Sequence, residues 1–167
     1  DAQCDACLAA PAYLASISGS HAALTMGGKQ PSSRIPSQRL IGLPPIVSGD
    51  IRLLILGSFP GVASLHAQQY YAHPYNQFWR ILQSIWPSMP LQIGSDGYAQ
   101  RCDWLLARGL GLWDVYANCE RMGSLDSAIT GAVVNDFARL KRRCPQLKVI
   151  AHNGGESFKH AGATAAL

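Results

Sequence analysis

Residues 51–79 decide the fold of this chain; they read IRLLILGSFPGVASLHAQQYYAHPYNQFW. The segment opens with an apolar run over residues 51–56 that only Arg52 interrupts, and a Gly/Pro loop follows. A continuous apolar run of this length is typical of a parallel strand that is covered on both faces. Because α/β proteins bind ligands beyond the carboxyl ends of parallel strands, we expect a site in the loop after residue 56.

The loop does not match the common phosphate-binding or nucleophile motifs. It lacks the spacing G-x-x-x-x-G-K-[ST] of a P-loop and the spacing G-x-G-x-x-G of a dinucleotide fold. Ser58 directly follows Gly57, one position too early for a G-x-S-x-G elbow. The chemistry of this loop must therefore come from other residues.

The regular part of the chain alternates between strand and helix patterns. Apolar runs predict strands over residues 51–57, 110–115 and 147–151. Apolar residues at helical spacing follow Phe78, Tyr98 and Phe137, with Asn135 or Asp136 as N-cap of the third helix. This alternation predicts an α/β fold in which a short parallel sheet lies between two helical layers, as α/β/α. A three-stranded sheet is thin, so we expect a further strand beyond Leu167.

Composition divides the chain and limits its partners. Residues 1–45 are rich in Ala, Ser, Gly and Pro and predict an irregular or partly disordered extension, whereas residues 46–167 predict one α/β domain. The net charge of +4 permits a polyanionic partner without requiring one, and the basic run over residues 139–143 is typical of a solvated helix face. No apolar run approaches the roughly 20 residues of a membrane span, so we expect no membrane partner.

Five cysteines without disulfide-framework density favour a reducing, cytoplasmic location. Cys4 and Cys7 form a single C-x-x-C, and with two of the distant Cys102, Cys119 and Cys144 they make a four-thiolate iron–sulfur cluster conceivable. Cys102 and Cys144 lie on apolar helical stripes, however, where a cysteine is usually a small hydrophobe. We therefore expect no cofactor and no metal site.

Several sequence blocks, in order, resemble the uracil-DNA glycosylase superfamily, and within it the hypoxanthine (deoxyinosine) DNA glycosylases. The blocks are GSFPG at 57–61, YYAHPYNQFW at 70–79, GLWDV at 111–115, RMGSLD at 121–126, NDF at 135–137 and HNG at 152–154. The mismatch-specific uracil/thymine glycosylases are similar through the block around Asn76, but they carry an Asn where this chain has Phe59. That Asn positions the attacking water, so the resemblance implies that Asn76 takes this role here.

The resemblance implies an enzyme that rotates a damaged base out of DNA into a pocket and cleaves its glycosidic bond by hydrolysis. Tyr71 would supply the stacking surface, with Phe59 closing the other side. An amide such as Asn76 accepts a hydrogen bond from the water without bringing a charge. The implied site residues are Asn76 as the catalytic residue, and Gly57, Ser58, Phe59, Gly61, Tyr71, His73 and Asn153 as substrate-binding residues.

Structural roles remain open for the same residues. Asn76 precedes a helical stripe and can be its N-cap, while Tyr71 and Phe59 can be core or rim aromatics. His73 can be a loop-fixing hydrogen-bonding residue rather than a catalyst, and Asn153 can be a turn former. Trp79 and Trp113 are interpreted as core residues, Asp126 as a cap or loop anchor, and Asp114 is left open between a structural role and a contact with the site.

The predicted function is monofunctional excision of hypoxanthine from DNA by a monomer, with uracil as an open second substrate. No lysine lies in the first loop, so no Schiff-base step is expected. The family has a second motif beyond its final strand, a Pro/Ser-containing wedge, and nothing after His160 resembles it. We therefore expect the wedge to lie outside this chain. The alternatives are a catalytically silent nucleic-acid or nucleotide-binding domain of the same fold, and an iron–sulfur glycosylase-like protein.

Overall fold

The computed structural model describes residues 39–92 and 95–165. Its centre is a three-stranded parallel sheet of β2 (Leu53–Gly57), β3 (Leu110–Asp114) and β6 (Val149–His152), in the order β3-β2-β6. Both pairings with β2 are parallel, with Leu56 opposite both Trp113 and His152. The three strands therefore end at the same edge of the sheet, and the predicted parallel arrangement is confirmed.

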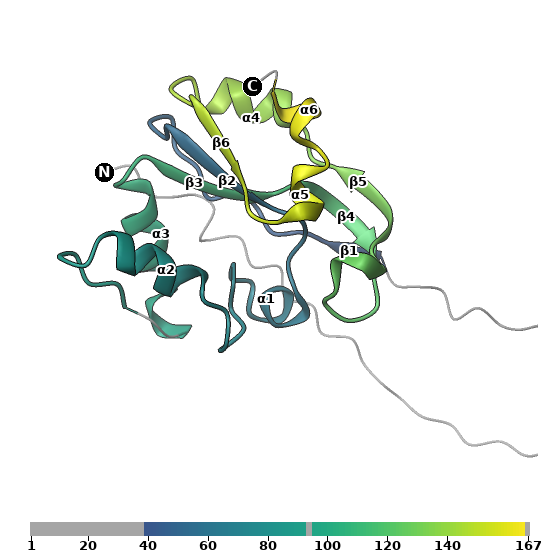
Figure 1. The fold of residues 1–167 in the computed structure, drawn as a ribbon, viewed down its shortest axis with the longest axis horizontal. Helices are drawn as coiled ribbons and strands as arrows, with labels where there is room; N and C mark the ends of the chain where they lie inside the picture. The colour runs from purple at the N-terminus through teal and green to yellow at the C-terminus, as the bar shows by residue number, and fades with distance from the viewer. Residues whose placement is uncertain (1–38, 93–94, 166–167) are drawn as a thin grey trace, which may run out of the picture. The chain divides into compact units, whose positions relative to one another are not determined.

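Helices cover both faces of this sheet, which confirms the α/β/α layering (Figure 1). In the view of Figure 1, α1, α2 and α3 lie below the sheet, and α4 and α6 lie above it. The helices are α1 (Val62–Ala67), α2 (Phe78–Ile85), α3 (Tyr98–Leu106), α4 (Phe137–Arg143), α5 (Gly155–Phe158) and α6 (Ala161–Thr164), with short 3-10 turns η2 (Ser95–Gly97) and η3 (Asp126–Ala128).

Local sequence signals account for the helix ends. Helix α2 ends at Ile85, just before Pro87, whose ring cannot continue a helix. After α3 the chain turns at Gly109, whose φ of +67° lies in the left-handed region that glycine tolerates best. The Asp136 side chain caps α4 by accepting a hydrogen bond from the backbone N–H of Arg139 at 2.9 Å.

A second, antiparallel sheet was not predicted. It consists of β1 (Arg39–Ile41), β4 (Tyr116–Glu120) and β5 (Thr130–Val134), in the order β1-β4-β5. No strand was predicted between residues 115 and 147, so β4 and β5 are additions to the predicted fold. Every residue of β5 is exposed and β4 mixes polar with apolar residues, so neither segment shows an apolar alternation from which a strand is predicted.

The predicted boundary of the N-terminal extension at residue 45 is also too late. Residues 39–41 form β1, Leu43 is buried, and the backbone N–H of Gly42 donates to the Ala117 carbonyl at 2.8 Å. The β1 segment therefore belongs to the α/β domain. Residues 1–38 of the predicted extension, including Cys4 and Cys7, lie outside the described residues.

The apolar core fills the space between the sheet and both helical layers. Its fully buried members include Leu54 and Leu56 of β2, Leu105 of α3 and Leu112 of β3. Trp79 and Trp113 are buried, as predicted, and so are the cysteines Cys102, Cys119 and Cys144. The basic side chains over residues 139–143 are exposed on α4. Among the described residues, no helix has both the length and the apolar character needed to span a membrane.

Candidate active site

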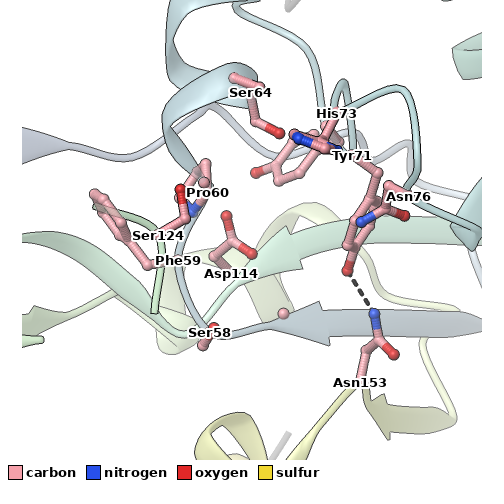
Figure 2. Close-up of a pocket in the computed structure, with 14 residues that line it drawn as sticks. Ser58, Phe59, Pro60, Ser64, Tyr71, His73, Asn76, Asp114, Ser124 and Asn153 are labelled. Atoms are coloured by element: carbon pink, nitrogen blue, oxygen red, sulfur yellow. Dashed lines mark hydrogen bonds between the residues drawn. The ribbon is translucent and has the colours of Figure 1, made fainter. Parts of the chain in front are cut away.

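A cavity of about 270 Å³ lies at the edge where the three parallel strands end (Figure 2). This volume is at the lower limit of small-molecule pockets and suits a single planar heterocycle. Every residue predicted for the site lines it. The lining consists of the predicted Gly57, Ser58, Phe59, Gly61, Tyr71, His73, Asn76 and Asn153, together with Pro60, Ala63, Ser64, Tyr70, Asp114 and Ser124.

Tyr71 forms a rigid aromatic wall of this cavity. Its phenol oxygen accepts a hydrogen bond from Asn153 Nδ2 at 2.7 Å, a contact drawn as a dashed line in Figure 2. Its ring stacks on Phe78 with centroids 4.0 Å apart and 22° between the planes. Phe78 lines a neighbouring hollow and not this cavity, so the opposite face of Tyr71 is the one directed at the cavity.

The backbone and the ionisation state of Tyr71 are both constrained. Its φ of +55° is uncommon for a residue that carries a side chain, and it is held by the packing and hydrogen bond just described. Burial raises the pKa of the phenol well above its usual value, against the smaller lowering effect of the Asn153 hydrogen bond. Tyr71 therefore presents a neutral, fixed ring face, which is what stacking on a base requires.

Asn76 occupies a tight turn at the rim of the cavity. Its side-chain oxygen accepts a hydrogen bond from the backbone N–H of Phe78 at 2.9 Å, immediately at the start of α2. Its own N–H donates to the His73 carbonyl at 2.8 Å, and His73 Nδ1 accepts from the Tyr75 N–H at 3.3 Å. The loop-fixing contact considered for His73 is present. Asn76 binds the first residue of α2 through its side chain, but the N-cap of that helix is Gln77, so the predicted N-cap position is one residue too early. Both Asn76 and His73 also line the cavity.

Phe59 lies on the other side of the cavity and is buried, with 6% of its surface exposed. The Arg121 guanidinium lies 5.1 Å from the centre of its ring, a cation–π distance. Arg121 also donates from Nη2 to the Pro60 carbonyl. Arg121 thereby holds the Phe59-Pro60 peptide in place, although the sequence had not singled it out.

Two further hydrogen bonds fix the first loop to the segment after β4. Ser58 Oγ donates to Asp126 Oδ1 at 2.8 Å, which confirms the interpretation of Asp126 as a loop anchor. The backbone N–H of Val62 donates to Ser124 Oγ at 2.9 Å. The two segments are 60 or more residues apart in sequence and form one wall of the cavity.

Asp114 is the site residue whose role the sequence left open. It is 4% exposed, its Oδ2 has no hydrogen-bond partner among the described residues, and its carboxyl is directed between Pro60 and Tyr71 in Figure 2. Burial raises its pKa to about 7, with a further increase from the charge of Asp126 and an opposing effect of Arg121. Asp114 is therefore an ionisable group at neutral pH with an unused oxygen at the cavity.

The sequence carries one weak signal for the role of Asp114, which is its position at the end of a predicted strand, as Gly57 is at the end of another. The strand register pairs it with Gly57, and a Cβ at position 57 would collide with Asp114 Oδ1. A glycine at the end of one predicted strand beside an acid at the end of the next is compatible with a carboxyl that lies over the glycine. The register itself, however, is visible only in the structure.

The arrangement suits a flat heterocycle that carries both N–H and C=O groups. Tyr71 offers a ring face, Asp114 a buried carboxyl, and Asn76 an amide at the rim. Across the residues that the structure describes, no group of three or more His, Cys, Asp or Glu side chains is arranged to hold a metal ion.

Comparisons with known proteins agree with this architecture. The model of the "Uracil DNA glycosylase superfamily" matches residues 44–165. A hypoxanthine DNA glycosylase of Methanosarcina barkeri is 40% identical over 123 residues, covering 71% of this chain and 73% of the relative. A second, from Methanosarcina acetivorans, is 36% identical over 119 residues, with the same coverage.

A solved structure shows the same fold. The solution NMR structure of a candidate uracil DNA glycosylase from Methanosarcina acetivorans has a TM-score of 0.68 and 33% identity, over 77% of this chain and 78% of that one. The family model spans most of this chain and includes every residue that lines the cavity. This chain therefore belongs to the uracil DNA glycosylase superfamily and is a DNA N-glycosylase.

Proposed function

We propose that this enzyme removes hypoxanthine from deoxyinosine in DNA, with Asn76 positioning the water that attacks the sugar. The observation that carries the proposal is that all eight residues expected at such a site line one cavity of nucleobase size. The two curated relatives bear the name hypoxanthine DNA glycosylase and are 40% and 36% identical to this chain, which supports the choice of base.

In the proposed complex the extruded base stacks on the free face of Tyr71. Phe78 supports this ring from behind at 4.0 Å, so the ring does not yield when the base enters. Phe59 closes the opposite side, where Arg121 fixes its position. Rotation of a base out of the duplex costs a few kcal/mol of stacking and pairing, and the contacts in the cavity offset this cost.

Asp114 faces the polar edge of the base in this proposal. Hypoxanthine carries an N–H at position 1, whereas adenine has a lone pair there. An ionised Asp114 accepts a hydrogen bond from that N–H and repels the adenine lone pair, so it favours the deaminated base. Uracil also carries an N–H beside a carbonyl, so the same contact accommodates it, and uracil is the second candidate substrate.

The proposed reaction is a hydrolysis. The oxygen of the water forms a bond to C1′ of the deoxyribose, the bond between C1′ and the base nitrogen breaks, and its electron pair leaves with the base. The base takes up a proton, the water loses one, and the products are free hypoxanthine and an abasic site. Asn76 supplies orientation rather than charge, because its amide oxygen accepts from the water.

The test is alkali-revealed strand cleavage of labelled duplexes that contain inosine, uracil or a thymine mismatch, incubated with the natural full-length protein. We expect cleavage at inosine to exceed cleavage at uracil and at thymine. Binding of all the duplexes without cleavage of any would identify a catalytically silent binding domain instead. Cleavage of uracil alone would replace hypoxanthine with the second candidate. The monomeric state and the cytoplasmic location remain predictions.

A further inference from the structure

Several exposed apolar side chains lie close in sequence to residues that line the cavity. Among the described residues, the four most exposed large hydrophobic side chains are Met122 at 88%, Tyr75 at 84%, Ile41 at 76% and Leu125 at 72%. Three of these four lie within two residues, in sequence, of a residue that lines the cavity. Met122 and Leu125 are close in sequence to the lining residue Ser124, and Tyr75 precedes Asn76.

Residues 121–126, here called the rim loop, are anchored to the first loop at three points although they expose Met122 and Leu125. At its start, Arg121 is buried and donates to the Pro60 carbonyl. At its middle, Ser124 Oγ accepts from the Val62 N–H at 2.9 Å, and at its end Asp126 accepts from Ser58 at 2.8 Å. Between these anchors, Gly123 turns the chain with a φ of +70°.

A rigid backbone that exposes large apolar side chains is costly in water and is typical of a surface that a partner covers. The partner here is constrained by the cavity wall, since Ser124 belongs to both the rim loop and the cavity lining. DNA that presents a base to the cavity therefore comes close to the rim loop, which also carries the exposed Met122 and Leu125. The only part of a duplex with an apolar interior to receive these side chains is the base stack.

We propose that the rim loop is a wedge that enters the DNA base stack beside the extruded nucleotide, with Met122 and Leu125 filling the gap. Apolar side chains of this kind, Met and Leu included, part base steps in many DNA-bending proteins. The rim loop is distinct from the wedge expected beyond the final strand, because it follows β4 and is anchored to the loop after β2. The inference rests on the proposed function only in that a base must leave the stack to reach the cavity.

The anchors explain how the wedge acts without moving. Arg121, Ser124 and Asp126 tie the rim loop directly to the segment that carries Ser58 and Phe59. Because of these contacts, the rim loop keeps its position relative to the cavity wall when Met122 enters the base stack. As a result, the gap in the DNA and the cavity that receives the base keep a fixed separation.

The first test compares excision of hypoxanthine from duplex and single-stranded DNA by the natural full-length protein and the double variant Met122→Ala/Leu125→Ala. Single strands have no stack to part, so we expect a loss of about 10-fold or more in the duplex and a change of less than about 2-fold in single strands. Val149→Ala, at the opposite end of β6 from Asn153 and 51% exposed, is the control and should change neither rate. An equal fall in the excision rate on both substrates would contradict the wedge and show that the two side chains support the structure of the site. An unchanged rate on both substrates would also contradict the wedge.

The second test needs no base excision, so it separates the wedge from the proposed function. A duplex carries a stable abasic analogue beside 2-aminopurine, whose fluorescence rises when it is unstacked. The wild-type protein should raise the fluorescence on saturation, and the double variant should bind with little rise. A rise of the same size with both proteins would refute the wedge, even if the wild-type enzyme removes hypoxanthine.

Discussion

The carboxyl of Asp114 lies in the space that a side chain at Gly57 would occupy. A Cβ at position 57 would collide with Asp114 Oδ1 and would also come within 3.3 Å of the Tyr71 hydroxyl. The two residues are paired in register at the ends of β2 and β3. Because Gly57 has no side chain, the carboxyl of Asp114 can lie over the end of β2 and line the cavity.

This relationship predicts the effect of Gly57→Ala. The new methyl group must displace the Asp114 carboxyl from its present position at the cavity. We expect excision to fall by about 10-fold or more, on the scale of losing one well-placed polar contact in an active site. Single-turnover rates measure the change. Gly162→Ala is the matched control because a Cβ there meets no atom within 4 Å, and it should leave the rate unchanged.

Asp114 also makes the stability of the fold depend on pH. Burial raises its pKa from 3.8 to about 7 in the folded chain, so the folded state holds a proton that the unfolded state has lost. The free energy of unfolding should therefore decrease as the pH rises from about 4 to about 7, and the decrease should stop above that range.

Asp114→Asn keeps the shape of the side chain and removes this ionisation. Near pH 4 the variant and the wild type should be similarly stable, and near pH 8 the variant should be more stable by up to about 4 kcal/mol, the equivalent of a shift of about three pKa units. Urea unfolding at both pH values measures the difference. A difference that does not change with pH would contradict the assigned pKa.

Much of this architecture was predictable from local patterns. The run over residues 51–56 and the helical stripe from Phe78 specify a buried strand and a helix, and both are found where predicted. Strand β5 was not predictable, because all five of its residues are exposed and only pairing with β4 makes it a strand. Asp114 was left open for a related reason, since its burial depends on a register with β2 that no local pattern encodes.

The hydrogen bond between Tyr71 and Asn153 yields a prediction that separates stacking from hydrogen bonding. Tyr71→Ala removes the ring face and should lower excision by about 5- to 150-fold, the range for losing a base–aromatic stack of 1–3 kcal/mol. Tyr71→Phe and Asn153→Ala each remove the same 2.7 Å hydrogen bond and keep the ring, so each should cost about 1 kcal/mol of stability.

A double-mutant cycle checks that assignment. Since Tyr71→Phe and Asn153→Ala delete one shared contact, the double variant should be no less stable than the less stable single variant. Fully additive losses would show that the two side chains act separately. A Tyr71→Ala variant that folds and excises as fast as the wild type would remove Tyr71 from the proposed stacking role.

Ionisation of Asp114 further predicts a pH dependence of base selection. Below about pH 7 the carboxyl is mainly protonated and can donate to the adenine lone pair, whereas above it the carboxylate repels that lone pair. The preference for hypoxanthine over adenine should therefore increase as the pH rises through about 7. Competition between inosine and adenosine duplexes for the enzyme measures this preference, and Asp114→Asn should show a preference that is constant with pH.

Asn76 is central to the account because its contact with Phe78 and its proposed role with water are separable. Asn76→Ala removes both, whereas Asn76→Ser keeps a short side-chain acceptor that suits a helix start. We expect Asn76→Ala to lose about 1 kcal/mol of stability and Asn76→Ser to lose less. Melting temperatures of the two variants measure the structural part.

The most direct measurement is the single-turnover rate at which the natural full-length protein and these two Asn76 variants release free hypoxanthine from an inosine duplex. With all proteins folded and saturating, the account predicts a fall of about 100-fold for both variants, because neither retains the amide that positions the water. DNA affinity should change little, since phosphate contacts dominate it. Release of hypoxanthine at the wild-type rate by folded Asn76→Ala would contradict the account.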